Sequence, residues 1–172
     1  MYLHYSKPFD INSLSTSITS LNIDHLTGNE PSFTSLTIAN FPELVDISID
    51  RYSFLYVRFF TIEDCNKLQH FSTKRNTLST SIFEDSESCF SIHRCQQLET
   101  VYFAPYSCSS YRHFSISGNF ISFIIEIDCP SLQSLEFCGY AFCYATEFII
   151  KGLVLLHYLI NRSSYVTESY IE

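Results

Sequence analysis

Cysteine and histidine are the residues of this sequence whose types could do chemistry, as metal ligands or as a nucleophile with its base. The chain has seven cysteines and six histidines. Zinc sites are typically built from two closely spaced pairs such as C-x2-C, and no such pair occurs in the sequence. Two wider pairs remain as alternatives for metal binding, Cys89 with Cys95 and Cys138 with Cys143. Because most of the cysteines recur in a repeated phrase, we expect buried structural thiols and no metal or cofactor.

A cysteine nucleophile would need a histidine base beside it. His93 and His113 are the candidates, and nothing in the surrounding sequence marks either of them. Acidic residues cluster at Glu84, Asp85 and Glu87, where a solvated loop is the simplest interpretation. The four glycines are isolated, so the sequence has no glycine-rich phosphate loop. These observations predict that the chain is not an enzyme, with a cysteine or serine hydrolase as the least favoured alternative.

The charge of the chain bears on its partners. A net charge of -8 repels phosphate backbones, and the largest basic stretch is the pair Lys74-Arg75. The most apolar segment, residues 148–160, is shorter than the roughly 20 residues that a membrane-spanning helix needs. We therefore expect neither nucleic-acid binding nor membrane insertion. The N-terminus does not resemble a signal peptide, which predicts a cytoplasmic protein, or a cell-surface one if an upstream signal peptide is missing from this sequence.

One phrase of alternating apolar and polar residues, L-x-x-L-x-L, recurs along the chain. Its first position is occupied by Leu44, Leu68, Leu98, Leu132 and Leu156. The second and third apolar positions hold the pairs Ile47 and Ile49, Phe71 and Thr73, Val101 and Phe103, Leu135 and Phe137, Leu159 and Asn161. Five residues further on, an apolar residue recurs again, for example Phe54, Leu78 and Cys108. An earlier, weaker copy of the phrase is Phe33, Leu36 and Ile38.

A second phrase, F-x-I-x-x-C, precedes most of the leucine phrases. It is written as Phe60, Ile62 and Cys65, and again as Phe90, Ile92 and Cys95; related copies begin at Phe114, Ile125 and Phe148. We interpret each F-x-I segment as a strand and the cysteine as the position where the chain turns. A small thiol fits beneath the next layer there and donates weakly to loop carbonyls.

The spacing of the phrases predicts a repeat architecture. Leu44 to Leu68 and Leu132 to Leu156 are each 24 residues apart, whereas Leu68 to Leu98 is 30, which indicates an insertion near residues 80–85. Each alternating phrase is typical of a strand with one face buried. One repeat buries too few side chains to offset the conformational entropy of ordering it, so neighbouring repeats must stack. The expected fold is a β-rich solenoid of stacked parallel strands with little helix.

The repeated phrases resemble those of leucine-rich repeats. The likeness covers residues 33–166 with gaps, and LQHFSTKRNTL at 68–78 fits L-x-x-L-x-L-x-x-N-x-L with its asparagine at Asn76. Tyr52, Tyr106, Tyr140 or Ser164 stands at the asparagine position elsewhere. The period and the cysteine before the leucine phrase resemble the BspA-like subgroup. The resemblance implies a curved array of parallel strands whose concave face binds proteins, without enzymatic activity.

We expect residues 1–32 to form a degenerate N-terminal coil or cap, in which Leu21, Ile23 and Leu26 pack, and residues 33–172 to form the repeat array. A further F-x-I strand would begin at the last residue, so we expect either an array that is truncated at its C-terminus or one whose last coil is exposed. The exposed terminal coil then offers a strand edge for self-association.

The outward positions of the leucine phrases are the predicted binding surface, because aromatic and charged residues in rows suit a protein partner. The candidate residues are Asp46, Asp50, His70, Lys74, Tyr102, Glu136 and Tyr158. The expected function is a non-catalytic scaffold for protein–protein interaction. A non-functional fragment of a larger repeat protein and a cell-surface adhesin are the alternatives. A plain solvated sheet face explains the same residues without any partner.

Overall fold

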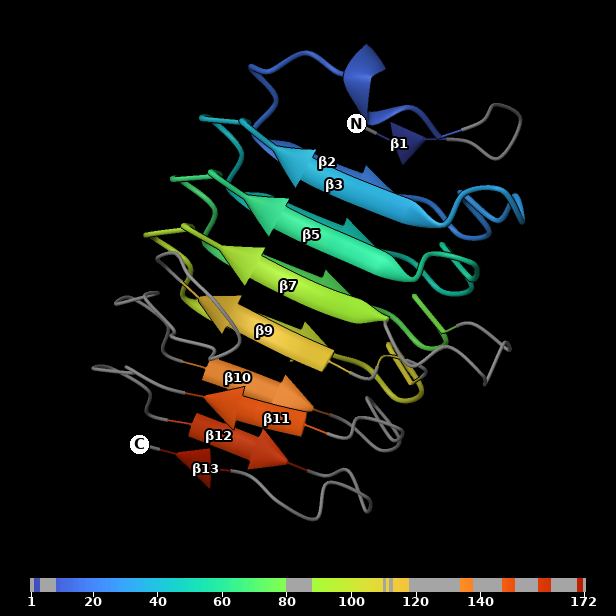
Figure 1. Ribbon diagram of the computed structural model, residues 1–172. Helices are drawn as coiled ribbons and strands as arrows, with labels where there is room; N and C mark the ends of the chain where they lie inside the picture. Colours follow the sequence, from blue (N-terminus) through green and yellow to red (C-terminus); the bar gives the residue numbers. More distant parts are fainter. Residues whose placement is uncertain are drawn as a thin grey trace.

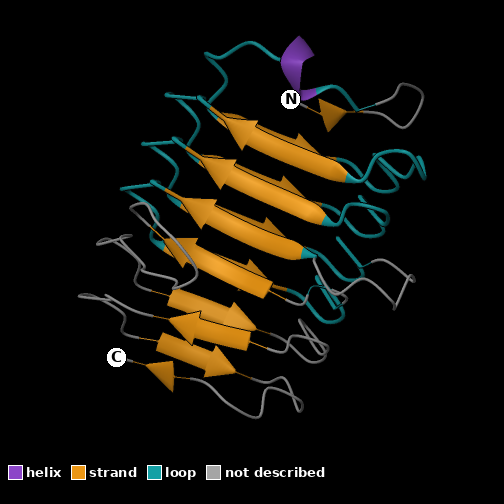
Figure 2. Ribbon diagram, viewed as in Figure 1, coloured by secondary structure: helices purple, strands orange, loops and turns teal. Residues whose placement is uncertain are grey.

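Strands and turns make up almost all of the described chain. The structure is a computed structural model that describes residues 2–3, 9–79, 88–109, 111, 113–117, 134–137, 147–150, 158–161 and 170–171. Over these residues the strands form one seven-stranded and one six-stranded sheet, and every strand pairing is parallel (Figure 1). In the described part of the chain, helix is confined to a short 3-10 turn, η1 (Ile11–Ser13), as Figure 2 shows. The expectation of parallel strands with little helix is confirmed.

Each sheet has a simple strand order. The first sheet consists of β1 (Tyr2–Leu3), β2 (Ser20–Ile23), β4 (Asp46–Ile49), β6 (His70–Thr73), β8 (Thr100–Phe103), β10 (Ser134–Phe137) and β12 (Tyr158–Asn161), in that order. The second sheet consists of β3 (Ser35–Ala39), β5 (Phe59–Glu63), β7 (Cys89–His93), β9 (His113–Ser117), β11 (Glu147–Ile150) and β13 (Tyr170–Ile171), in that order. From β2 onward, consecutive strands of the chain lie in alternate sheets, and the strands of the two sheets point in opposite directions (Figure 1).

The leucine phrases lie in the first sheet in the register that the sequence predicts. Ile47 pairs with Phe71, Phe71 with Val101, Val101 with Leu135, and Leu135 with Leu159. Side chains of β4, β6 and β8 alternate between half-buried or exposed and buried positions, as expected for strands that have one face in a core. The leading leucines of these three copies are fully buried: Leu44, Leu68 and Leu98.

The F-x-I phrases lie in the second sheet. Phe60 pairs with Phe90, Phe90 with Phe114, and Phe114 with Phe148. Phe60 and Phe90 stack with ring centroids 5.1 Å apart, and Phe90 also contacts Phe71 and Phe103 of the first sheet at 5.6 and 5.2 Å. The core therefore lies between the two sheets, and its aromatic rings join them.

Two predictions about the N-terminal region are wrong. Leu36 and Ile38 lie in β3 and pair with Phe60 and Ile62, so the segment from Phe33 is a copy of the F-x-I phrase and not of the leucine phrase. Both phrases alternate with a period of two, and that period alone does not assign a strand to a sheet. Leu26, which the sequence predicts to pack in the first coil, is instead 41% exposed and lies in a turn, where its φ is 61°.

The first leucine-type strand is instead β2, inside the region 1–32. Leu21 and Ile23 pair with Ile47 and Ile49 of β4 and are buried, as the sequence predicts for these two side chains. This part of the chain therefore contributes a strand to the same sheet as the later copies.

The cysteine position is a turn, as the sequence predicts. Cys65 and Cys95 are fully buried, and each follows a residue with positive φ, Asp64 at 56° and Arg94 at 52°. The Cys65 thiol lies 3.5 Å from the Glu63 carbonyl, and the Cys95 thiol lies 3.4 Å from the carbonyl of His93. Backbone hydrogen bonds from Leu68 to Cys65 and from Leu98 to Cys95 close the two turns in the same way.

The turns that follow the first-sheet strands contain a column of buried hydroxyl groups. Its members occupy one position of successive repeats: Thr27, Ser53, Thr77 and Ser107. The Ser53 hydroxyl donates to the Asp24 carbonyl at 2.8 Å, and the Thr77 hydroxyl donates to the Asp50 carbonyl at 2.9 Å. Each of these bonds links one turn to the preceding one, which satisfies backbone acceptors that the strands leave unpaired.

Several sequence predictions fall outside the described residues. They are the insertion at residues 80–85, the acidic cluster at 84–87, the F-x-I copy at 125–129, Leu132, Leu156, and the pair Cys138 and Cys143. Within the described part of the chain, no helix reaches the length and apolar character needed to cross a bilayer.

Candidate functional site: the outer face of the first sheet

The register of the first sheet brings the predicted binding residues into two rows. Asp46 pairs with His70, and Tyr158 stands at the same register position two strands beyond Thr100. Tyr102 pairs with Glu136 in the second row. The side chains of Glu136 and Tyr158 lie outside the described residues. Neighbouring parallel strands lie about 4.8 Å apart, so each row places one side chain per strand on a common face.

Hydrogen bonding joins neighbouring strands across this face. His70 Nδ1 lies 2.8 Å from Thr100 Oγ1, and both side chains are half-buried. Tyr102 is 37% exposed, so its ring presents a large apolar surface and a hydroxyl group beside the smaller Ser72 with which it is in register. The face therefore combines a rigid aromatic side chain with an imidazole and several hydroxyl groups. Such a mixture is typical of surfaces that bind protein segments.

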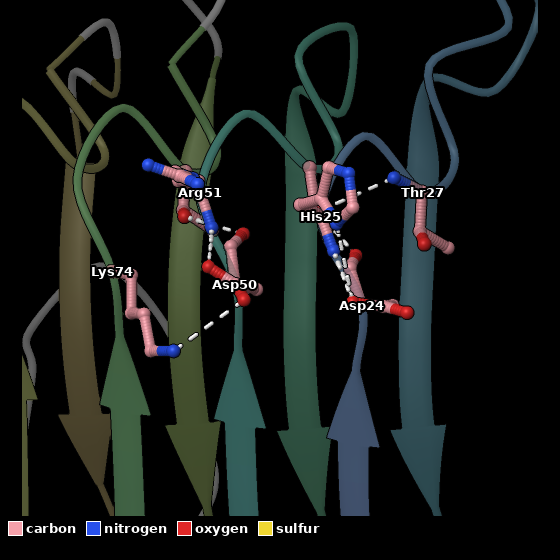
Figure 3. Close-up of polar contacts among 8 residues, drawn as sticks. Asp24, His25, Thr27, Asp50, Arg51 and Lys74 are labelled. Atoms are coloured by element: carbon pink, nitrogen blue, oxygen red, sulfur yellow. Dashed lines mark hydrogen bonds and ion pairs between the residues drawn. The ribbon is translucent and has the colours of Figure 1, made fainter. Parts of the chain in front are cut away.

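The two remaining predicted residues lie just beyond the strand ends. Asp50 follows β4, and Lys74 follows β6; the Lys74 ammonium lies 3.4 Å from Asp50 Oδ2 (Figure 3). One strand earlier, Asp24 Oδ1 lies 3.3 Å from Nδ1 of His25. Because Lys74 is largely exposed, its ion pair adds little stability, and both charges remain within reach of a partner.

The opposite turns carry a tighter charge cluster. The Arg94 guanidinium donates to both carboxylate oxygens of Asp64, at 2.7 and 2.6 Å, and to Glu63 at 3.0 Å. The hydrogen bond from Arg94 lowers the pKa of Asp64, and the same contacts raise the pKa of Arg94. These three residues hold successive turns together, so we interpret them as structural and not as ligands for a partner.

The outer face of the second sheet differs in character. Thr37, Thr61, Ser91 and Ser115 form one register row, in which Thr61 Oγ1 and Ser91 Oγ lie 3.0 Å apart. Ser91 is only 6% exposed, whereas Phe59 in the neighbouring row is 36% exposed. Two hydroxyl groups of this row, those of Thr61 and Ser91, thus bond to each other within the sheet, and Phe59 is a large exposed side chain in the neighbouring row.

The cysteines of the described residues are free thiols. Burial raises the pKa of the thiols of Cys65, Cys89 and Cys108. A raised pKa keeps a thiol protonated and lowers its nucleophilicity, which disfavours the cysteine-hydrolase alternative at these positions. Among the described residues, no group of three or more His, Cys, Asp and Glu side chains is arranged to hold a metal ion. Cys89 and Cys95 lie in β7 and the turn after it, where Cys95 occupies the buried turn position.

The sequence reasoning missed the exposed side chains of the turns after the first-sheet strands. Arg51 and Arg75 occupy one repeat position there, and Tyr52 and Tyr106 occupy the next. Both tyrosines have positive φ, 58° and 61°, in the conformation that Asn76 adopts at 56°. The signal in the sequence was the pair Arg51-Tyr52 after β4 and the pair Arg75-Asn76 after β6, with Tyr106 at the equivalent place after β8. From the sequence, Tyr52 and Tyr106 were interpreted only as departures from the asparagine position of the leucine-rich-repeat pattern.

Comparisons with protein-family models, with curated proteins and with solved structures gave no match for this chain.

Proposed function

We propose that this chain is a leucine-rich-repeat solenoid of the BspA-like kind, and that it serves as a non-catalytic scaffold that binds a protein partner through the outer face of the first sheet. The fold proposal is supported by the alternation of strands between two parallel sheets and by the shared register of the leucine phrases. The cytoplasm is the proposed location, because the cysteines of the described residues are free thiols, as is usual in a reducing compartment.

The observation that carries the proposed binding role is the row arrangement of the first sheet. Asp46, His70 and Thr100 stand in one row, and Ser72 and Tyr102 stand in the other, on strands held rigidly by ladder hydrogen bonds and a buried aromatic core. A rigid surface loses little conformational entropy on binding, and an exposed tyrosine contributes large contact area at low entropic cost.

The sheet pair offers a matched test of this role. Tyr102 on the first sheet and Phe59 on the second are exposed to nearly the same extent, 37% and 36%. We expect Tyr102→Glu to abolish capture of the partner from native lysate, because it places a carboxylate at the centre of the proposed contact. Phe59→Glu introduces the same charge on the opposite face and is expected to leave capture unchanged.

Quantitative mass spectrometry of the captured proteins would separate the outcomes. Proteins retained by the wild type and by Phe59→Glu but lost with Tyr102→Glu would support the first-sheet face. Loss of the same proteins with Phe59→Glu alone, or no loss with either variant, would contradict it. Circular dichroism of both variants would verify that each is folded.

A further inference from the structure

The turns after β4, β6 and β8 bring basic and aromatic side chains together at one edge of the molecule. Arg51 and Arg75 each lie two residues beyond a register pair, Ile49 with Thr73, and so occupy equivalent places in neighbouring turns. Tyr52 and Tyr106 follow at the next position, and each of these four side chains is exposed. We call Arg51, Tyr52, Arg75 and Tyr106 the turn ridge. Figure 3 shows the same edge from Lys74 through Asp50 and Arg51 to Asp24 and His25.

The backbone beneath the turn ridge is held firmly. The Thr77 hydroxyl bonds to the carbonyl of Asp50, and the Ser107 hydroxyl bonds to the carbonyl of Ala104 at 2.5 Å within its own turn. Tyr52 and Tyr106 have left-handed backbone conformations, which favour glycine or asparagine over an aromatic residue. The turns thus hold two tyrosines in a conformation that their own preferences disfavour, and direct them outward.

The charge of the turn ridge is opposite to that of the whole chain. The chain carries a net charge of -8, whereas the turn ridge itself carries two arginines, Arg51 and Arg75; Lys74, Asp50 and Asp24 lie beside it on the same edge. The charge of Lys74 is partly neutralised by Asp50, whose Oδ2 lies 3.4 Å from the Lys74 ammonium. The Arg75 guanidinium carbon lies over the Tyr106 ring, 5.1 Å from its centroid, which is within the range of a cation–π contact. A guanidinium has five N–H donors in its plane, so an arginine beside an aromatic ring can still bind a carboxylate.

We propose that the turn ridge is a second binding surface, separate from the first-sheet face, and that it takes an acidic peptide segment of a partner protein. The two arginines would donate to carboxylates of the peptide, and the two tyrosines would contact its apolar or aromatic side chains. Arginine and tyrosine are, with tryptophan, the residues most enriched where binding energy concentrates in protein interfaces. Here Arg51 and Tyr52 stand on one turn, and Arg75 and Tyr106 stand on the two turns that follow. A long anionic polymer such as nucleic acid is disfavoured, because the acidic remainder of the molecule repels it.

The test uses the full chain and a short fluorescent peptide in which glutamate alternates with tyrosine. Fluorescence anisotropy is expected to show binding that weakens between about 50 mM and about 300 mM salt. Arg51→Gln with Arg75→Gln should weaken binding about tenfold or more, and Tyr52→Ala about fivefold. Lys67→Gln is the matched control, because Lys67 is an exposed cation that pairs with Glu43 on the opposite turns, and it should leave binding unchanged.

Three results would overturn the proposal. The first is equal binding by the double arginine variant. The second is equal binding of a peptide with lysine in place of glutamate, or of a short RNA. The third is a dimer in sedimentation analysis that the arginine variant dissociates, since the ridge would then face a second copy. Tyr102→Glu should leave peptide binding intact, so failure of the first-sheet proposal and failure of the ridge proposal are distinguishable.

Discussion

Phe90 is the side chain through which the packing of the two sheets can be tested most sharply. It is fully buried in β7, and its ring contacts with described residues include four aromatic rings: Phe60 in its own sheet, Phe71 and Phe103 in the first sheet, and Tyr111 at 6.1 Å. Phe90→Leu keeps the site apolar but removes all four ring contacts. If each contact contributes about 0.5 kcal/mol beyond burial and the smaller side chain loses about 1 kcal/mol more, the free energy of unfolding falls by about 3 kcal/mol.

Urea unfolding monitored by circular dichroism would measure this loss. With a slope of about 2 kcal/mol per molar urea, Phe90→Leu should lower the unfolding midpoint by about 1.5 M. Phe59→Leu is the control, because Phe59 lies on the outer face of the same sheet and should change stability by no more than about 0.5 kcal/mol. Equal shifts for the two variants would refute the assignment of Phe90 to a core shared by both sheets.

Two further predictions concern the turns and the buried titratable groups. Thr77→Val should lower the free energy of unfolding by about 1–2 kcal/mol by leaving the Asp50 carbonyl without its donor, while Thr77→Ser retains the bond and stability; thermal unfolding of the pair measures the difference. Burial raises the pKa of Cys108 and of Tyr111, so their stabilising effect is complete below the unfolded values of about 8.5 and about 10 and is lost as pH rises through the higher folded values. The melting temperature should therefore fall above about pH 8.5, and less steeply for Cys108→Ala; an identical pH profile for that variant would contradict the assigned burial of the thiol.

The leucine phrases could be read from the sequence because their spacing is tied to strand pairing. A shift of one residue would turn every buried side chain outward, so Ile47, Phe71 and Val101 had to share a register. The cysteine turns were predictable for a related reason, since a buried position of fixed size recurs after each F-x-I strand.

Other features were beyond the sequence patterns. The segment at Leu36 and Ile38 was assigned to the wrong phrase, because alternation identifies a strand but not the sheet in which it lies. Tyr52 and Tyr106 in left-handed turns run against the preferences of aromatic residues. The turn at Tyr52 is bonded to the preceding turn through the Ser53 hydroxyl and the Asp24 carbonyl, a contact between repeats that local propensity does not encode.

Only part of the two proposed surfaces could be predicted from the sequence. The outward residues of the first-sheet strands followed directly from the leucine alternation, so Asp46, His70 and Tyr102 were named from sequence alone. The turn ridge was not recognised, because Arg51 and Arg75 lie 24 residues apart and form a basic edge only when successive turns stack. Residues that are brought together by the stacking of turns can be identified only once the register between the repeats is known.

The central claim is that successive leucine-phrase strands lie side by side in one sheet. The F-x-I strand that comes between them in the sequence lies in the other sheet. Oxidative cross-linking of the double variant Ser48→Cys with Ser72→Cys tests this directly, because these residues pair in register between β4 and β6. Paired parallel strands lie about 4.8 Å apart, within the range that a disulfide spans. Peptide mapping should detect the 48–72 disulfide and none for Ser48→Cys with Thr61→Cys on β5. A disulfide between positions 48 and 61, or none between 48 and 72, would contradict the account.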